Sequence, residues 1–314
     1  MNNKKILILG ADGFLGSNLV KSLFADKKYE IRAFDLFKDG TSRNLAGFEK
    51  KLEIFQGNFL NQSDLKKALK GIDFVFHYIS LTTPGSSMKD PLIDVETNIR
   101  GTIILLEECV KAKVKKVIFS SSGGAIYGNQ EKDLLNEDDL QNPISPYAIS
   151  KLAIEKYLEY YRLNHGLEYL IFRYSNPYGP GQNIVGSQGI IPIFLNLVKQ
   201  KKPITIFGDG KNVRDYIFID DAIENTKKLA FKQNTKHRIY NIGKGEGATI
   251  NEIVSAIQKA TKMKMKIKKM PARSIDVRRV VLDTDRIKKE INYSSDTSLE
   301  KGIQKTWNWI QNAI

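Results

Sequence analysis

The chain has 314 residues, of which 41% are hydrophobic and 27% charged, and its formal net charge is +14. This length and composition predict a globular protein with a sizeable core, and they exclude a fibrous or largely disordered chain. The lysines are spread along the chain beside many Asn and Ile residues. We therefore read the charge as composition bias that also suits a diphosphate substrate, and we expect no nucleic-acid partner.

The cysteine and histidine content and the apolar runs exclude several further classes of protein. Cys109 is the single cysteine, which leaves no disulfide framework or thiolate metal site. The three histidines are far apart in sequence, so we expect no metal. The first apolar run, residues 6–9, is too short for a signal sequence or a membrane span. We expect a cytoplasmic protein without membrane insertion.

The first half of the chain alternates short apolar runs with amphipathic segments. The expected strands cover residues 6–9, 29–34, 52–56, 74–77, 116–120 and 169–173. Strands that alternate with helices imply right-handed crossovers and a parallel sheet covered on both faces. The predicted fold class is α/β, a Rossmann-type doubly wound parallel sheet with a smaller α/β substrate-binding lobe.

The second half is less regular after a Gly- and Pro-rich stretch that follows Asn176. We expect helices over residues 192–200, 220–231 and 249–261, a half-buried strand within the lysine-rich segment 259–269, and a C-terminal helix carrying Trp307 and Trp309. The predicted dinucleotide-binding domain covers residues 1–175, with 213–242 returning to it. The second lobe would comprise residues 176–212 and 243–314.

A glycine-rich loop directly follows the first strand. Gly10, Gly13 and Gly16 occupy the spacing that lets a backbone turn tightly, approach a pyrophosphate and pack a helix on a strand. Asp35 ends the second strand about 20 residues later, where a carboxylate accepts both ribose hydroxyls. The same charge repels a 2′-phosphate, so the predicted cofactor is NAD rather than NADP.

Tyr147 and Lys151 stand at i and i+4, on one face of the helix that follows Pro146. A neighbouring lysine favours the phenolate form of a tyrosine, so the pair predicts an acid/base site. Ser122 lies at the carboxyl end of an expected strand, where the substrate of such a sheet binds. It is a candidate to hydrogen-bond the reacting hydroxyl.

These residues resemble the extended short-chain dehydrogenase/reductase family, and within it the UDP-glucose 4-epimerase-like branch. The likeness covers nearly the whole chain. It rests on the glycine loop, Asp35, His77, Asn98-x-x-Gly-Thr102, the serine loop, Tyr147/Lys151, and the segments 173–182, 208–216 and 273–276. It implies a homodimer joined through a helix bundle, with helices about residues 94–112 and 147–164.

The resemblance also implies roles for individual residues. Tyr147 would be the acid/base, assisted by Lys151 and Ser122. The cofactor contacts would come from Gly10, Gly13, Phe14, Leu15, Gly16, Asp35, Asn58, Phe59, His77, Asn98, Lys151 and Tyr174. The nucleotide-sugar contacts would come from Ser122, Tyr147, Asn176, Arg214 and Arg273.

Three positions depart from the family pattern. Counting back from Tyr127, the usual catalytic Ser or Thr position is Gly123, which displaces Ser122 by one residue. Tyr78 follows His77 where the family has small residues, and Asn58 replaces an aspartate that contacts adenine. A valine, Val280, falls near the position that gates the sugar C2′ substituent, so N-acetylated or uronic acid sugars would have room.

The predicted function is an NAD-dependent nucleotide-sugar 4-epimerase that oxidises C4′ to a 4-keto sugar and reduces it again. Its substrate would be UDP-glucose/UDP-galactose or the N-acetylhexosamine or uronic acid equivalents. The alternatives are a 4-keto-sugar nucleotide reductase or a dehydratase of the same family. An RNA-binding Rossmann-fold module is a more remote alternative.

Overall fold

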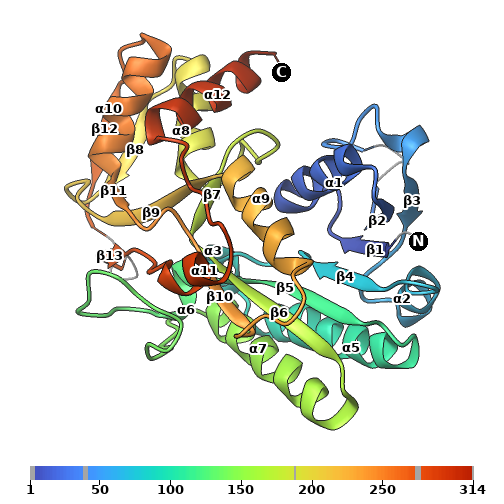
Figure 1. Ribbon diagram of the computed structural model, residues 1–314. Helices are drawn as coiled ribbons and strands as arrows, with labels where there is room; N and C mark the ends of the chain where they lie inside the picture. Colours follow the sequence, from blue (N-terminus) through green and yellow to red (C-terminus); the bar gives the residue numbers. More distant parts are fainter. Residues whose placement is uncertain (1–3, 38–41, 187–188, 273–276, 313–314) are drawn as a thin grey trace. The chain divides into compact units, whose positions relative to one another are not determined.

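The protein is described by a computed structural model that covers residues 4–37, 42–186, 189–272 and 277–312 (Figure 1). The chain divides into two compact units. The first consists of Met1–Ser122, Ser145–Phe172 and Thr226–Tyr240, and the second of Gly123–Ile144, Arg173–Asn225 and Asn241–Ile314.

The two largest differences between these compact units and the predicted domain boundaries concern residues 123–144 and the returning segment. Residues 123–144 lie in the second unit, because Ile126, Tyr127 and Leu135 pack in an apolar cluster with Val280 and Leu282. The segment that returns to the first unit begins at residue 226 instead of 213. Periodicity along the chain carries no information about such long-range packing.

The main sheet has seven strands in the order β10-β6-β5-β4-β1-β2-β3. Their bounds are β1 Lys4–Leu9, β2 Tyr29–Asp35, β3 Glu53–Gln56, β4 Phe74–His77, β5 Lys116–Ser122, β6 Glu168–Tyr174 and β10 Ile239–Ile242. β1 pairs in parallel with both β2 and β4, so the strand order reverses beside β1. This order confirms the predicted Rossmann-type doubly wound sheet, and it places a crevice at the carboxyl ends of β1 and β4.

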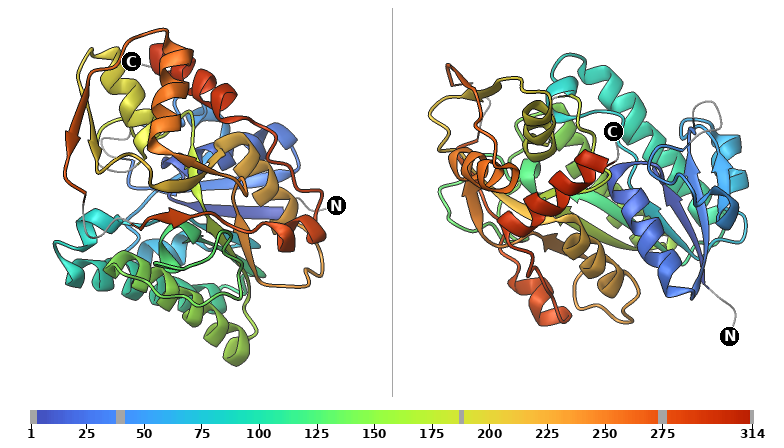
Figure 2. Two further views of the ribbon diagram at one scale, coloured as in Figure 1. Left: turned by 90° about the vertical axis from the view of Figure 1, so that its left-hand side faces the viewer. Right: turned by 90° about the horizontal axis from the view of Figure 1, so that it is seen from above.

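Helices cover both faces of this sheet within the first unit (Figure 1). The strand β1 is buried along Ile6–Leu9, as expected for a parallel strand with helices on either side. The core on one face joins the strands to α2, α5 and α7, and α1 packs against β1 and β2. Both views of Figure 2 show α5 and α7 side by side.

Helices and short helical turns connect the strands of the first unit. They are α1 Phe14–Asp26, the short 3-10 turn η2 Glu49–Lys51, α2 Gln62–Ala68, α3 Pro84–Ser87, α4 Pro91–Asp94, the π-helical segment η3 Val95–Arg100, α5 Gly101–Lys111 and α7 Pro146–His165. The helix α9 Ile219–Ala230 crosses from the second unit into the first.

The second unit is built from two small sheets and four helices that lie wholly within it, besides the short α6 Gly123–Ile126. Its strands are β7 Asn176–Tyr178, β8 Ile204–Phe207, β9 Val213–Phe218, β11 Gly247–Thr249, β12 Ile267–Met270 and β13 Arg279–Val280. Its helices are α8 Ile190–Lys199, α10 Ile250–Thr261, α11 Asp285–Glu290 and α12 Leu299–Asn312. β9 is central, because β7, β11 and β13 all pair with it.

The strand expected within residues 259–269 is wrong in extent and burial. Lys259 belongs to α10, and the helix continues until Lys262 caps it in a left-handed conformation. The strand β12 covers only Ile267–Met270, and all four residues are exposed. Local alternation of Met and Lys did not reveal that this strand lies at a sheet edge.

Candidate active site

The helix α7 carries the predicted acid/base pair, and its start is well defined by the local sequence. Ser145 is the N-cap, and its hydroxyl accepts a hydrogen bond from the Ala148 N–H at 3.3 Å. Pro146 occupies the first helical position, where its missing N–H costs nothing. Tyr147 and Lys151 therefore lie one turn apart at the beginning of the helix.

Three predicted catalytic side chains meet in the first unit. The Ser122 hydroxyl hydrogen-bonds the Tyr147 phenol, and the Lys151 ammonium lies 5.7 Å from the centre of the Tyr147 ring. Lys151 also donates a hydrogen bond of 2.8 Å to the Ser120 carbonyl oxygen. The end of β5 and the first turn of α7 thus form one site.

Burial sets the protonation of this site. It raises the pKa of Tyr147 to about 12, against which the hydrogen bond from Ser122 acts, and the charge of Asp94 raises it further. Burial also lowers the pKa of Lys151 to about 8, which the carboxylates of Asp94 and Glu155 oppose. A neutral phenol and an easily deprotonated ammonium stand together, as in sites that transfer protons near neutral pH.

The glycine loop between β1 and α1 has the geometry of a dinucleotide-binding turn. Gly10 has a φ of +80°, a conformation that favours glycine. A Cβ atom at Gly16 would lie 2.0 Å from the Gly10 carbonyl oxygen. The helix α1 and the loop therefore approach so closely that residue 16 must lack a side chain. Gly13 is the N-cap of α1, and Phe14 and Leu15 begin its first turn.

Asp35 ends β2 beside this loop. Its Oδ2 accepts a hydrogen bond of 2.9 Å from the Asp12 N–H, and its Oδ1 accepts one of 2.8 Å from the Leu36 N–H. Burial raises the pKa of Asp35, and the two N–H donors act in the opposite direction. The carboxylate is thus held at the mouth of the loop, as a ribose-binding acid requires.

The remaining predicted cofactor residues of the first unit surround β4. His77 is buried, and its Nε2 lies 2.9 Å from the Thr102 hydroxyl, whereas its Nδ1 has no hydrogen-bond partner among the residues described. Burial lowers the pKa of His77 to about 3, so the ring is neutral. Phe59 packs with its ring centre 5.2 Å from that of His77, and Asn58 is exposed just before it.

Asn98 lies in η3, and the chain itself uses its amide. Its Nδ2 donates to the Thr82 hydroxyl at 2.7 Å and to Asp94 at 2.9 Å. Its Oδ1 accepts a hydrogen bond of 3.0 Å from the Leu81 N–H. Asn98 therefore holds the loop after β4 in place.

Sequence reasoning missed the buried polar residues that support the pair. Asp94 accepts hydrogen bonds from Thr82 and Ser150, and Glu155 accepts one of 2.5 Å from Ser121. Two signals were present in the sequence. Asp94 stands four residues before Asn98 in a helical stretch, and Ser150 lies inside the Tyr147-x-x-x-Lys151 motif.

Two of the predicted nucleotide-sugar residues, Asn176 and Arg214, belong to the second unit. Asn176, at the start of β7, donates from Nδ2 to the Asp215 carbonyl oxygen at 2.9 Å. Arg214 is half-buried on β9, and its Nη1 donates to the Val213 carbonyl oxygen at 2.9 Å. Tyr174 is buried at the end of β6, and Arg273 lies outside the described residues.

The first glycine after Ser122, Gly123, has a packing reason. A Cβ atom at Gly123 would lie 2.6 Å from a methyl carbon of Leu282 and 3.1 Å from the Arg173 carbonyl oxygen. Val280 is buried in the same cluster as Leu282. The position that would carry a hydroxyl in the family pattern is thus filled by apolar packing in this chain.

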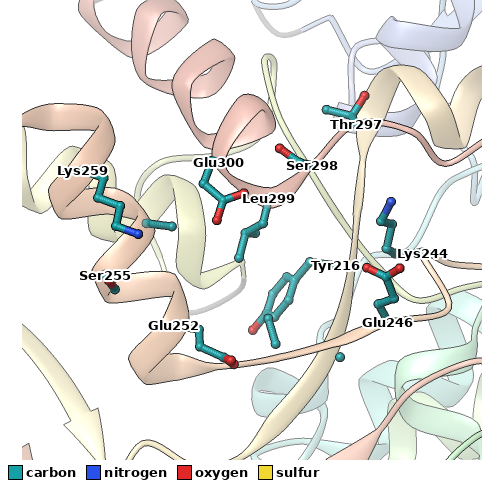
Figure 3. A pocket seen from close by; sticks show the side chains of 13 residues that line it. Tyr216, Lys244, Glu246, Glu252, Ser255, Lys259, Thr297, Ser298, Leu299 and Glu300 are labelled. Carbon is teal, nitrogen blue, oxygen red and sulfur yellow. The ribbon is translucent and has the colours of Figure 1, made fainter.

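The second unit also contains a pocket of about 360 Å³ between β9, α10 and the start of α12 (Figure 3). Figure 3 shows Tyr216 projecting into it, with Lys259 and Glu300 on its helical walls. Neither Asn176 nor Arg214 lines this pocket.

The described part of the chain contains neither a membrane-spanning helix nor a cluster of metal-binding side chains. No helix there is long and apolar enough to cross a membrane. Within the same residues, no three His, Cys, Asp or Glu side chains are grouped so that they could hold a metal ion.

Comparison with known proteins places this geometry in a family. The model of the NAD dependent epimerase/dehydratase family matches residues 6–243. The UDP-glucose 4-epimerase of Mycolicibacterium smegmatis is 32% identical over 312 residues, which cover 98% of this chain and 99% of that protein.

Two solved structures are similar over nearly their whole length. The UDP-glucose 4-epimerase of Thermotoga maritima with UDP-glucose is 33% identical, with a TM-score of 0.91 and coverage of 98% of both chains. The UDP-glucuronic acid 4-epimerase of Bacillus cereus with UDP-glucuronic acid and NAD is 30% identical, with a TM-score of 0.89, and the match covers 99% of this chain and 100% of that chain. The resemblance inferred from the motifs is confirmed, and the chain belongs to the NAD dependent epimerase/dehydratase family.

Proposed function

We propose that this protein is a nucleotide-sugar 4-epimerase with bound NAD. The observation that carries the proposal is the meeting of Ser122, Tyr147 and Lys151 in the unit that also holds the glycine loop and Asp35, whose carboxylate is bonded to that loop. The similar proteins from three bacteria, which are named as 4-epimerases of UDP-glucose or UDP-glucuronic acid, support the same reaction.

The residues of the first unit fit NAD. The close contact of Gly16 with Gly10 leaves the backbone free to approach a pyrophosphate, and the start of α1 points N–H groups toward it. Asp35 would hold the adenosine ribose, with Asn58 and Phe59 nearby, and Lys151 would hold the nicotinamide ribose. When bound, NAD⁺ supplies an acceptor for the C4′ hydride and a positive charge beside the phenol.

The residues of the chain manage the proton of the sugar hydroxyl. Tyr147 in its phenolate form would take the proton from O4′ and return it at the end. Because C4′ also regains its hydride, no net oxidation would occur. Ser122 stabilises the phenolate by donating a hydrogen bond to it. Lys151, fixed by the Ser120 carbonyl, keeps a positive charge within reach of the same oxygen.

The serine loop argues against the alternative reactions. A dehydratase needs an acid and a base near C5′ and C6′, and the residues that follow Ser122 are Gly123-Gly124-Ala125, which have no proton to transfer. A 4-keto-sugar reductase that exchanges NADPH is disfavoured by the half-buried carboxylate of Asp35, which would repel a 2′-phosphate. Intact Tyr147 and Lys151 argue against an RNA-binding module.

The substrate in this proposal is a UDP-hexose. Asn176, Arg214 and Arg273 would bind the nucleotide diphosphate, for which guanidinium groups are well suited. Val280 is smaller than the tyrosine of epimerases that exclude N-acetylated sugars, which favours a broad substrate range.

The helix-bundle homodimer and the cytoplasmic location are part of the same proposal. Several apolar side chains of α4, η3 and α7 are exposed, as a surface between two copies requires. They are Leu92, Ile93, Val95, Ile149, Tyr157, Tyr160 and Leu163. A role in polysaccharide biosynthesis belongs to the same proposal.

The test is turnover without added cofactor. Purified protein is incubated separately with UDP-glucose, UDP-GlcNAc and UDP-glucuronic acid, and the sugars are identified by NMR. We expect a C4′ epimer from at least one of them, and its loss in Tyr147→Phe. If none changes, yet NADPH is oxidised when a 4-keto sugar nucleotide is supplied, the protein is a reductase and the proposal is wrong.

A further inference from the structure

Asp94, the last residue of α4, is a fully buried carboxylate beside the catalytic turn. It is 0% exposed, and it accepts hydrogen bonds from the hydroxyls of Thr82 and Ser150 and, at 2.9 Å, from the Asn98 amide. A buried carboxylate is costly unless several donors satisfy it. Three side chains meet that need here.

The three donors come from separate segments of the first unit. Thr82 lies in the loop after β4, Asn98 in η3, and Ser150 in α7 between Tyr147 and Lys151. Asn98 is itself bonded to the Leu81 N–H. One carboxylate therefore joins the catalytic turn to the loop that borders the expected cofactor site.

Ser150 connects the Asp94 carboxylate directly to the helical turn that carries the acid/base pair. Ser150 is adjacent to Lys151 and three residues from Tyr147, so a bond that fixes Ser150 fixes the rotation of that turn about the helix axis. The segment η3 is π-helical, a local geometry that occurs frequently at functional sites. Both features indicate that Asp94 helps to position the acid/base pair and also stabilises the fold.

We propose that Asp94 and Ser150 form a positioning pair, which sets the orientation and the electrostatic environment of Tyr147 and Lys151. This inference rests on the proposed epimerase function. The charge of Asp94 raises the pKa of both Tyr147 and Lys151. Ser150 carries no charge, so the two residues contribute separable effects.

The other groups that face this turn are few. Glu155 of α7 acts on Lys151, and Lys151 acts on the buried ring of His77. The neighbouring helix α3 consists of Pro84–Ser87, and the first turn of α5 begins with Gly101–Thr102, so neither adds a titratable side chain there. Asp94 is therefore a main source of negative charge at the pair.

The kinetic test compares Asp94→Asn and Ser150→Ala with Ser150→Thr in the NAD-loaded protein. We expect kcat to fall about 10-fold or more in the first two, because small displacements of reacting groups are costly, with KM changed less than about threefold. Ser150→Thr keeps the hydroxyl and should restore kcat to within about threefold of wild type. Values of kcat within that range for both Asp94→Asn and Ser150→Ala would overturn the proposal.

The pH dependence separates positioning from simple structural support. Loss of the Asp94 charge lowers the pKa of Tyr147, so the acidic limb of kcat should move to lower pH in Asp94→Asn and stay in place in Ser150→Ala. Asp73→Asn is the matched control. Asp73 is likewise a hydrogen-bonded carboxylate, which accepts from the Lys5 N–H at 2.9 Å, but it precedes β4 at the opposite end of the strand from His77.

A second readout needs no turnover. The titration of Lys151 is followed by NMR of ¹³C-labelled lysine, with its signal assigned by Lys151→Met. We expect a lower pKa of Lys151 in Asp94→Asn and no change in Asp73→Asn. An unchanged Lys151 titration in folded Asp94→Asn contradicts the electrostatic role, whereas absence of turnover in the wild type contradicts only the proposed function.

Discussion

The ammonium of Lys151 donates a hydrogen bond of 2.8 Å to the main-chain carbonyl oxygen of Ser120. Lys151 is on α7 and Ser120 is on β5, so this bond ties the helix that carries the phenol to the strand that carries Ser122. The ammonium also lies 4.7 Å from the centre of the Phe119 ring, which together with the carbonyl partly compensates for its burial. The lysine is thus structurally anchored and remains within reach of the phenol.

Lys151→Met should remove both the anchor and the charge. Because the positive charge favours the phenolate, we expect kcat to fall roughly 100-fold, within the range of acid–base contributions. Burial lowers the pKa of Lys151 to about 8, so the lysine loses its proton as the pH rises through 8. The wild type should therefore show an alkaline limb of kcat that is missing in the variant, as measured by pH-dependent turnover.

Ser122→Ala tests the assignment of the displaced serine. The hydroxyl lowers the pKa of Tyr147 by hydrogen bonding, so its loss should raise that pKa and move the acidic limb of kcat to higher pH. We expect kcat to fall roughly 10- to 100-fold. Ser121→Ala, which removes a neighbouring hydroxyl bonded to Glu155, provides the comparison. A larger loss there than in Ser122→Ala would contradict the assignment.

Gly16→Ala should damage the cofactor loop through packing alone. The added Cβ would lie 2.0 Å from the Gly10 carbonyl oxygen, so the loop must move. We expect unfolding free energy to fall by about 1–3 kcal/mol and the purified protein to retain less NAD. Gly85→Ala is the control, because nothing lies within 4 Å of a Cβ at that position. Denaturant unfolding and the NAD content measure the two effects.

Asp35→Asn should relax the choice of cofactor. The carboxylate repels a 2′-phosphate, and an amide does not, so the preference for NAD over NADP should fall by about tenfold, equivalent to about 1.4 kcal/mol. The amide oxygen can still accept the hydrogen bond from Asp12 N. Calorimetric titration with each dinucleotide gives the ratio, and an unchanged ratio would show that Asp35 does not select the cofactor.

Asp215 should make stability depend on pH. Burial raises its pKa to about 6, although the N–H groups of Lys244, Gly245 and Leu282 oppose the shift. The unfolded chain releases the same proton near pH 4, so the folded state holds it more tightly. The stabilisation is present below pH 4 and is lost as the pH rises through 6, by about 3 kcal/mol at most.

Asp215→Asn removes this titration. The amide faces N–H donors and should lower the unfolding free energy at low pH, but the contribution of residue 215 should then be constant with pH. The difference in unfolding free energy between wild type and variant should therefore shrink between pH 4 and 6. A constant difference across that range would contradict the shifted pKa.

The predicted strands of the first half were confirmed, and the central ones among them are buried along most of their length. Such strands are continuous runs of apolar residues that read clearly from the sequence, as in β1 and β4. The second half was harder to predict. Its strands are short, β12 is fully exposed, and the pairing of β9 with three partners depends on contacts between distant segments.

The sequence by itself determined the local motifs, which are the glycine loop, Asp35, and the helical pair Tyr147 and Lys151. Their chemistry depends on spacing along one strand or helix, which the order of residues defines. Only the tertiary structure decided which groups support them. Asp94, Thr82 and Ser150 are 12 to 68 residues apart, and it is the packing of α4 against α7 that brings their side chains to one buried carboxylate. Long-range packing also filled the space at Gly123 with Leu282, so that the hydroxyl bonded to Tyr147 comes from Ser122.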